Sequence, residues 1–438
     1  MIPLAFDTDR ALADVHWLVE ELGPRVHNTG AEVEAVDGIM KRLRDAGWEP
    51  KRLQGSPVAC RGSGGMLFLA HIDSVPGSPG AVDNAAGVAI LLELARSSEA
   101  SDVCLGFPIG EEYGLIGSRA MAKHWTDAPL DLVVSLDLIA SGTPTAVDLN
   151  ADWGFPEMEW LSTTNAVDVP YLYRLAGRAF PQWRSDHAPF ARSGVLAFQI
   201  KTRGDDLVFP RYHQHSDTSA DAEGMQATAS ALEAMAKNGP PPRGEADPAF
   251  LAFGAAVPGS LVWGTWILGL LSGLPGLPRA GECLRDLVRL SVMTTAAAIV
   301  MWAFLFIGFP SSEAELTAHQ IMGHPATGWW HAAPWAVAAG WLVWLAMWRA
   351  LPSQGHPAFV AAAFSVGAVF IDPLVALPFS LAALGVRIHP LLGLMPALLF
   401  VRPDPLREFA FYGLLEPWTW PLLLLLTWPA LGAIRGRS

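Results

Sequence analysis

The chain of 438 residues contains few cysteines. Its three cysteines, Cys60, Cys104 and Cys283, lie far apart in the sequence and form no Cys-x-x-Cys pair. This spacing excludes a metal site built from cysteines and predicts a fold without a disulfide framework. The sequence is therefore compatible with a reducing compartment.

Basic residues are also scarce. Lys and Arg number 29 against 42 Asp and Glu, which gives a formal net charge of -13. A nucleic-acid partner needs clustered basic residues that contact phosphates, so the composition argues against one. The first residues lack a basic leader followed by an apolar core, so no signal peptide is predicted. We therefore expect the N-terminal domain to be cytoplasmic.

Apolar residues make up 51% of the chain and are concentrated after residue 256. A bilayer core needs about 20 apolar residues per helix, and about six stretches meet or approach this length. We predict a multi-pass, all-α transmembrane domain over residues 257–438, separated by a Pro-rich linker (239–256) from a domain over residues 1–238. The candidate spans are 257–275, 286–309, 328–349, 358–384, 388–402 and 409–434.

The first domain alternates between strand-like and helix-like segments. Helices are predicted over 8–22, 31–46, 84–97, 115–124 and 219–237. Strands are predicted over 66–72, 103–109, 132–139 and 195–202. This alternation predicts an α/β fold in which helices flank a mostly parallel or mixed sheet. Ligands bind such sheets beyond the carboxyl ends of the strands.

Polar side chains stand at these strand ends. His71 and Asp73 close one predicted strand, and Asp83 precedes the following helix. Glu111 and Glu112 follow the next strand. A helix N-terminus favours a nearby carboxylate, which suits the position of Asp83.

Two further polar residues complete the pattern. Asp137 lies in the otherwise apolar strand VVSLDLIA, where an unpaired carboxylate is costly to bury. His213 lies in the loop RYHQHSDT before the last predicted helix of this domain. Imidazole and carboxylate groups are good ligands for zinc and similar divalent ions. The candidate ligands are His71, Asp83, Glu112, Asp137 and His213.

These residue types suit a site for two cations. Two cations about 3.5–4 Å apart need a bridging carboxylate and terminal ligands. Glu111, beside a candidate ligand, offers a free carboxylate that can act as general base. Asp73, two residues after His71, can hold that imidazole in orientation.

In order and spacing, the motifs resemble the co-catalytic zinc aminopeptidases of clan MH, peptidase family M28. That family shows His-x-Asp, Asp-Asn-x-x-Gly, Glu-Glu, a later Asp in a strand, and Tyr-His-x-x-x-Asp-Thr. All of these occur here, in that order, within roughly residues 10–237. The resemblance implies a membrane-anchored metallo-aminopeptidase with two zinc ions. It assigns His71 and Asp137 to one ion, Glu112 and His213 to the other, Asp83 to the bridge and Glu111 to the general base.

The chain departs from the family pattern at two positions. Val82 stands where many members have a second Asp, and Ala86 where many have Ser, but neither change removes a ligand. His215 competes with His213 for the last ligand position, and the Tyr-His pairing favours His213. The stretch 185–195 resembles the family's Ser-Asp-His-x-x-Phe segment, which shapes the rim of the site.

The substrate and the reaction leave alternatives open. A peptide that loses its N-terminal residue is the expected substrate, and the aromatic segment 150–182 is expected to form part of the side-chain pocket. A glutaminyl cyclase-like acyltransferase, a carboxypeptidase or a dipeptidase would use the same fold. A membrane scaffold or transporter with a vestigial peptidase domain is the third class of function. A single histidine in a loop is usually a surface residue, and His124 and His187 are the candidates for this.

Overall fold

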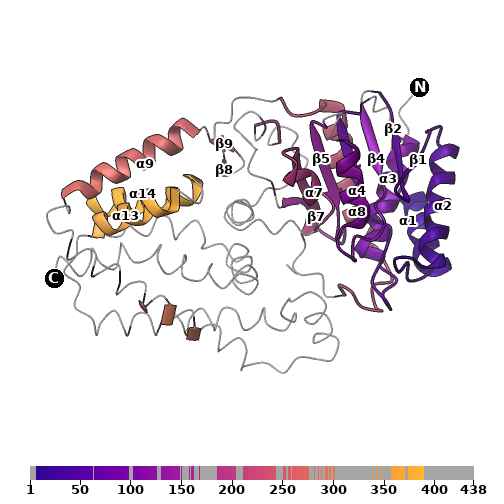
Figure 1. Cartoon of the computed structure of the whole chain (residues 1–438), viewed down its shortest axis with the longest axis horizontal. Coiled ribbons are helices and arrows are strands. Elements are labelled where there is room, and N and C mark those ends of the chain that lie inside the picture. The colour runs from indigo at the N-terminus through magenta and orange to yellow at the C-terminus, as the bar shows by residue number, and fades with distance from the viewer. Residues whose placement is uncertain are drawn as a thin grey trace. The chain divides into compact units, whose positions relative to one another are not determined.

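The chain forms two compact units, Met1–Ala256 and Val257–Ser438 (Figure 1). The computed structural model describes residues 6–62, 64–97, 102–125, 130–147, 185–203, 211–242, 250–252, 255–257, 259–275, 357–369 and 373–388, with single residues between these ranges.

A seven-stranded sheet forms the centre of the first unit, in the order β1-β2-β4-β3-β5-β7-β6. The four middle strands, β4, β3, β5 and β7, are parallel to one another, whereas β1, β2 and β6 pair antiparallel with their neighbours. The sheet is therefore mixed. The strands are β1 (Lys51–Leu53), β2 (Ser56–Cys60), β3 (Met66–Leu69), β4 (Val103–Gly106), β5 (Leu132–Leu136), β6 (Thr143–Val147) and β7 (Leu196–Arg203).

The parallel strands are those that the sequence predicts. The predicted strands 66–72, 103–109, 132–139 and 195–202 correspond to β3, β4, β5 and β7. The sequence did not reveal β1, β2 and β6. Pro57 in β2 and Pro144 in β6 weaken their strand pattern, because proline cannot donate to a sheet ladder.

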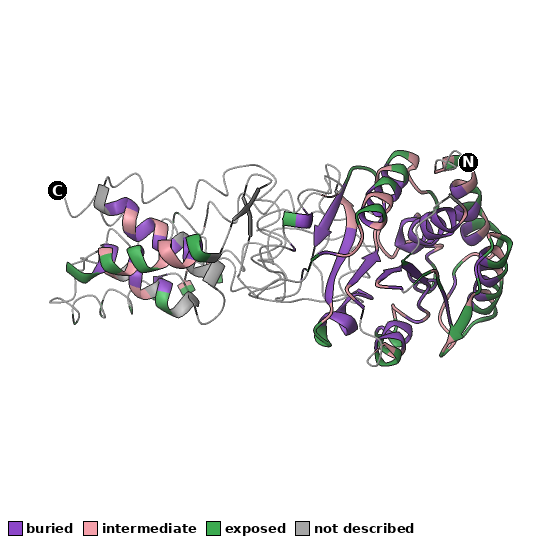
Figure 2. Ribbon diagram, turned by 90° about the horizontal axis from the view of Figure 1, so that it is seen from above, coloured by how far each residue is buried: buried purple, intermediate pink, exposed green. Residues whose placement is uncertain are grey.

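Helices cover both faces of the sheet. The helical elements that the structure describes in this unit are α1 (Thr8–His16), η1 (Trp17–Glu21), α2 (Gly30–Asp45), η2 (Ala81–Ala85), α3 (Ala86–Ser97), α4 (Ile116–His124), α7 (Ala188–Arg192) and α8 (Ala222–Asn238). One apolar cluster joins α1, α2, α3 and α8 to one face, and a second joins α4 and α7 to the other. Figure 2 shows the central strands buried and the outer surfaces of the flanking helices exposed.

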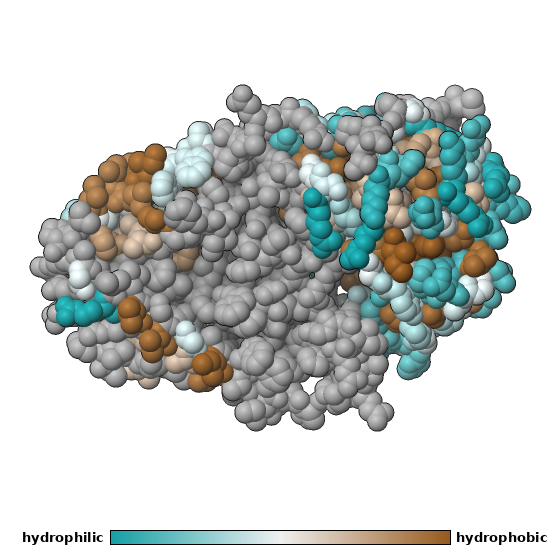
Figure 3. Space-filling model, viewed as in Figure 1, coloured by the Kyte–Doolittle hydropathy of each residue, from teal (hydrophilic) through white to brown (hydrophobic). Residues whose placement is uncertain are grey.

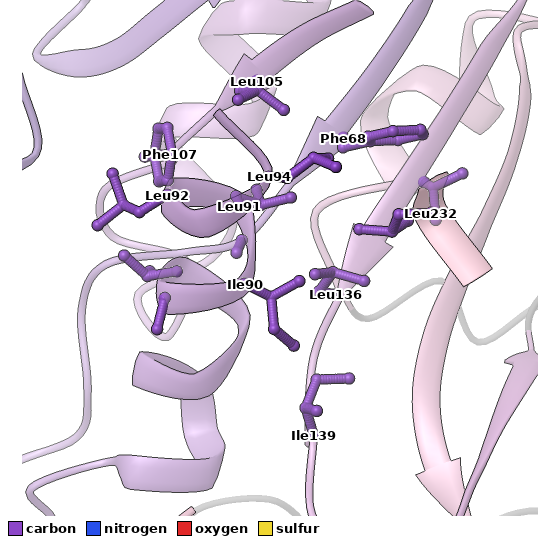
Figure 4. Packing of buried hydrophobic residues seen from close by; sticks show 14 of the residues in the cluster. Phe68, Ile90, Leu91, Leu92, Leu94, Leu105, Phe107, Leu136, Ile139 and Leu232 are labelled. Carbon is purple, nitrogen blue, oxygen red and sulfur yellow. The ribbon is translucent and has the colours of Figure 1, made fainter. Parts of the chain in front are cut away.

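The alternation of side chains along a strand explains this layering. In β3, Phe68 belongs to the first cluster, whereas Leu67 and Leu69 belong to the second. Figure 4 shows strand residues such as Phe68 and Leu136 facing the apolar side chains of α3. Burying one such side chain stabilises the fold by roughly 1.5–3 kcal/mol. Apolar packing on both faces therefore stabilises the sheet.

The sequence did not reveal the disulfide bond of the first unit. Cys60 and Cys104 form a disulfide bond, although 44 positions separate them in the sequence. They are directly opposite each other on the antiparallel strands β2 and β4, with Cα atoms 4.0 Å apart. Strand pairing, which the spacing of the cysteines does not reveal, brings them together.

The second unit is described mainly through three apolar helices, α9 (Gly259–Gly273), α13 (Pro357–Val369) and α14 (Pro373–Ile388). Within the residues that the structure describes, no helix is both long enough and apolar enough to cross a bilayer. Figure 3 shows apolar side chains gathered over α9. Leu261, Leu268 and Leu271 are each more than half exposed there.

The structure differs from two predictions for this part of the chain. The span predicted over 358–384 contains parts of two described helices, α13 and α14. The predicted linker 239–256 includes β8 (Phe250–Ala252) and most of β9 (Ala255–Val257), which pair with each other. The candidate spans that lie wholly or mostly outside the described residues are 286–309, 328–349, 388–402 and 409–434.

Candidate metal centre

The carboxyl ends of three adjacent parallel strands define the site. In the order β4, β3, β5, these ends lead to the Glu111–Glu112 pair, to His71 and to Asp137. Because neighbouring parallel strands end at the same edge, residues far apart in sequence meet there. Asp83, in η2, and His213, in the loop before α8, complete the cluster.

His71, Asp83 and Asp137 form the first group of possible ligands. The Nε2 atom of His71 lies 3.3 Å from Oδ1 of Asp83 and 3.8 Å from Oδ1 of Asp137. The side chains of His71 and Asp83 are almost fully buried, and that of Asp137 is 13% exposed. The group is therefore shielded from water on most sides.

Asp83, Glu112 and His213 form the second group. The Nε2 atom of His213 lies 3.2 Å from Oδ2 of Asp83 and 3.0 Å from Oε1 of Glu112. Asp83 thus directs one carboxylate oxygen toward each histidine. The structure brings all five candidate ligands together, with Asp83 shared between the two groups.

The donor atoms fit a pair of divalent cations. Within each group the potential ligand atoms lie within 4.8 Å of one another. The buried atoms that make no hydrogen bond to any residue that the structure describes include Nε2 of His71, Oδ2 of Asp83, Oε1 of Glu112 and Nε2 of His213. Buried polar atoms without hydrogen bonds are rare and costly, and binding to a cation removes this cost.

The pKa values of the cluster also favour bound positive charge. Burial would raise the pKa of Asp83, but the imidazoles of His213 and His71 hold it below its usual range. Burial raises the pKa of Glu112 to about 7, and the nearby Asp83 carboxylate adds to this effect. Burial would lower the pKa of His213, yet the carboxylates of Asp83 and Glu112 raise it to about 10. The cluster thus favours bound positive charge, which protons supply when cations do not.

His213, and not His215, faces the other ligands. His215 is exposed, whereas the side chain of His213 is 4% exposed and contacts Asp83 and Glu112. The backbone of His213 is left-handed, with φ of 58°, and the ring of Tyr212 stacks on its imidazole at 3.9 Å. Left-handed backbone is uncommon outside glycine, so the surrounding loop constrains this residue.

Asp73 supports the site in a different way from the one predicted. Its carboxylate accepts hydrogen bonds from the backbone N–H groups of Glu111, at 2.9 Å, and Glu112, at 3.1 Å. The backbone carbonyl of Asp73, rather than its carboxylate, is within hydrogen-bond distance of Nδ1 of His71, at 3.0 Å. Asp73 therefore holds the loop of the two glutamates through its side chain and the imidazole through its main chain.

Arg25 is a supporting residue that the sequence did not reveal. Its side chain is fully buried, and its guanidinium donates hydrogen bonds of 2.7–3.1 Å to five backbone carbonyls. Burial lowers its pKa to about 10, so it remains charged at neutral pH. Three of these carbonyls belong to the loop between His71 and Asp83, which the guanidinium therefore braces. The acceptors are the backbone oxygens of Leu18, Gly23, Ile72, Pro79 and Gly80.

The Ser-Asp-His segment lies in the interior. Ser185, Asp186 and His187 are all buried, so the expectation that His187 is a surface residue is wrong. Its Nδ1 atom lies 3.3 Å from the hydroxyl of Ser135 in β5. Burial raises the pKa of Asp186 to about 7. The predicted pocket segment 150–182 lies almost entirely outside the described residues.

The fold and the site together define a class of protein. A mixed α/β sheet carries two His–carboxylate groups with a shared aspartate at its strand ends, an arrangement suited to a metal-dependent hydrolase. Residues 56–236 match the model of Peptidase family M28. This part of the first unit is therefore similar to that family, as the motifs predict.

Several known proteins are similar to this chain. A vacuolar membrane protease of Yarrowia lipolytica is 27% identical over 53% of this chain and 25% of its own length. Aminopeptidase YwaD of Bacillus subtilis is 32% identical over 35% of this chain and 36% of its own length. A solved zinc aminopeptidase from Bacillus subtilis is 16% identical, with a TM-score of 0.43, over 53% of this chain and 94% of that chain. The chain thus spans well under half the length of the curated relatives it matches.

Proposed function

We propose that the first unit is a metallo-aminopeptidase that removes N-terminal residues from peptides. The observation that carries this proposal is the pair of ligand groups sharing Asp83, with a further glutamate, Glu111, beside the ligand Glu112. The family match of residues 56–236 and the similarity to a named aminopeptidase support it. The expected substrate is a peptide with a free α-amine.

The position of each residue supports a role in this reaction. His71 and Asp137 would hold one divalent cation, Glu112 and His213 the other, and Asp83 would bridge them. The expected ions are Zn²⁺, which when bound polarise the scissile carbonyl and lower the pKa of water. Glu111 takes the proton of the attacking water molecule and then donates it to the leaving amine.

Replacing Glu111 with Gln tests this assignment. Glu111→Gln keeps the shape of the side chain but removes its basicity. We expect hydrolysis of an aminoacyl p-nitroanilide to fall by about 10³-fold, within the usual range for a general base. Elemental analysis should still find two metal ions per chain. The exposed Glu34 provides a matched control, because Glu34→Gln changes the same side chain away from the site.

Turnover of Glu111→Gln at the wild-type rate would contradict the mechanism. Metal stoichiometry and substrate choice separate the alternatives. A glutaminyl cyclase-like acyltransferase is expected to need one zinc ion, so two ions per chain favour the hydrolase. Cleavage of substrates with blocked N-termini would favour a carboxypeptidase. A scaffold or transporter with a vestigial domain would show no hydrolysis at all.

We further propose that the second unit associates with a lipid bilayer, through several spans within residues 257–438. The name of the Yarrowia relative and the exposed apolar side chains of α9 support this. The full chain should float with phosphatidylcholine vesicles in a density gradient. Replacing the exposed Leu268 and Leu271 with Gln should weaken flotation, and full-chain protein that remains at the bottom of the gradient would contradict the proposal.

The disulfide bond bears on the compartment of the first unit. Such bonds are rare where the cytosol keeps thiols reduced, so the Cys60–Cys104 bond favours an oxidising compartment over the cytoplasmic location expected from the sequence. Maleimide labelling of freshly lysed cells distinguishes the two. We expect Cys60 and Cys104 to label only after reduction. Labelling without reductant would support the cytoplasmic location.

A further inference from the structure

Asp217 is a buried aspartate outside the set of candidate ligands. Its side chain is fully buried, four residues after His213. Both carboxylate oxygens accept the backbone N–H of Val82, at 3.0 and 3.2 Å, and Oδ2 also accepts the N–H of Asp83, at 3.2 Å. The backbone carbonyl of Asp217 accepts the N–H of Ala81 at 3.1 Å. Three successive backbone groups at Asp83 are therefore bound to one residue.

The same arrangement occurs once more in the site. Asp73, two residues after His71, uses its two carboxylate oxygens to accept the N–H groups of Glu111 and Glu112. Each histidine-bearing loop thus carries an aspartate that holds the backbone of acidic ligands in another loop. Asp73 holds the ligand Glu112, and Asp217 holds the ligand Asp83. The loops are cross-braced by charge-assisted hydrogen bonds, which are stronger than neutral ones.

Asp73 and Asp217 differ in consequence because they hold different ligands. Glu112 belongs to one ligand group, whereas Asp83 belongs to both. Rotation of the Asp83 backbone would move its two carboxylate oxygens, which lie 3.3 Å from His71 and 3.2 Å from His213, at the same time. A displacement at Asp83 therefore disturbs both candidate cation sites together.

We propose that Asp217 is a positioning residue that fixes the shared ligand Asp83, so that its loss weakens the binding of both cations. This inference rests on the two-metal centre of the proposed function. Asp217 acts through the backbone of η2 and needs no contact with the cations or with substrate. Supporting residues around metal ligands typically change metal affinity by about 10–100-fold when removed.

The experiment compares Asp217→Ala and Asp217→Asn with a matched control, Asp221→Ala. Asp221 also accepts a backbone N–H, that of Gly224 at 2.8 Å, but this hydrogen bond caps α8 rather than holding η2. Metal-free full-length protein is titrated with Zn²⁺ by calorimetry, and its thermal midpoint is measured. Hydrogen exchange is followed at the amides of Val82 and Asp83.

The expected results separate positioning from general stability. Asp217→Ala and Asp217→Asn should weaken both Zn²⁺ binding events by about 10–100-fold and accelerate exchange at Val82 and Asp83. Asp221→Ala should leave the Zn²⁺ affinity and the exchange at Val82 and Asp83 unchanged, even if its thermal midpoint falls as far as that of the Asp217 variants. Asp217→Asn keeps the size of the side chain, so it covers the case in which Asp217→Ala fails to fold.

Two results would overturn the inference. One is wild-type Zn²⁺ affinity in the Asp217 variants, and the other is an equal loss of affinity in Asp221→Ala. Failure of the proposed function gives a different result, because the wild-type protein would then bind fewer than two ions. In that case the exchange data still test whether Asp217 holds the backbone at Asp83. Unchanged exchange at Val82 and Asp83 in Asp217→Asn would overturn this, and faster exchange would support it.

Discussion

The two units bury different kinds of residue. In the first, charged side chains such as Arg25, Asp73 and Asp217 are fully buried around the candidate metal centre. In α9, α13 and α14 of the second, the buried polar side chains among the described residues are Ser365 and Ser380, and the rest of the packing is apolar. Buried charge costs free energy unless it is satisfied. The buried charges at the carboxyl edge of the sheet are therefore a cost in stability that binding of cations would offset.

The first unit should depend on individual buried hydrogen bonds, and Arg25 tests this most strongly. Arg25→Met leaves five backbone carbonyls without their donor, at about 1 kcal/mol each. We expect the free energy of unfolding to fall by about 5 kcal/mol, measured by urea denaturation of the full chain. Arg25→Lys should restore part of the loss, because an ammonium group has fewer donors than a guanidinium.

Arg52 supplies the control for that comparison. It is half-exposed and paired with Asp37 at the surface. Arg52→Met should cost less than about 1 kcal/mol, as exposed ion pairs usually do. If Arg25→Met and Arg52→Met were equally stable, the buried guanidinium would not be a brace and the contrast between the units would lose its main support.

The disulfide bond adds a covalent constraint to the first unit. Replacing both Cys60 and Cys104 with Ala should lower the free energy of unfolding by about 3 kcal/mol, because the unfolded chain regains the freedom of the loop between them. Reduction of the wild-type protein should lower its unfolding midpoint to a similar extent. Cys283→Ala keeps the bonded pair and serves as the control. A midpoint insensitive to reductant would show that the bond does not form.

The candidate ligands were predictable from the sequence because their chemistry is carried by residue type. His71, Glu112 and Asp137 follow apolar runs long enough to be recognised as strands, and parallel strands end at a common edge. The order of motifs then resembled a known family. What the sequence supplied was therefore the identity of the groups and the edge at which they meet.

The braces were not predictable, because their partners are backbone atoms. Arg25 and Asp217 bind carbonyl and N–H groups that every residue possesses, so no pattern of residue types marks the pairing. The Cys60–Cys104 bond was missed for a related reason. It depends on the register of β2 against β4, and β2 is a short strand containing proline that lacks a clear pattern.

In the second unit, close approach of small residues contributes to the packing of the helices, and two glycines of α9 test this. A Cβ atom on Gly269 would lie 2.8 Å from Cβ and 2.9 Å from Cα of Ser380 in α14, whereas one on Gly264 would meet nothing within 4 Å. Gly269→Ala should therefore separate α9 from α14, at a cost of about 1–3 kcal/mol. Gly264→Ala should stabilise α9 by up to about 1 kcal/mol, because alanine favours a helix.

Hydrogen exchange of the full chain measures both effects at the helix concerned. Amides of α9 and α14 should exchange faster in Gly269→Ala and those of α9 more slowly in Gly264→Ala, with exchange in the first unit unchanged. The two variants should change the exchange rate of α9 in opposite directions, although both add the same methyl group to the same helix. This difference separates close packing from helix propensity. If both variants slowed exchange, helix propensity alone would govern α9, and close packing against α14 would not distinguish the second unit from the first.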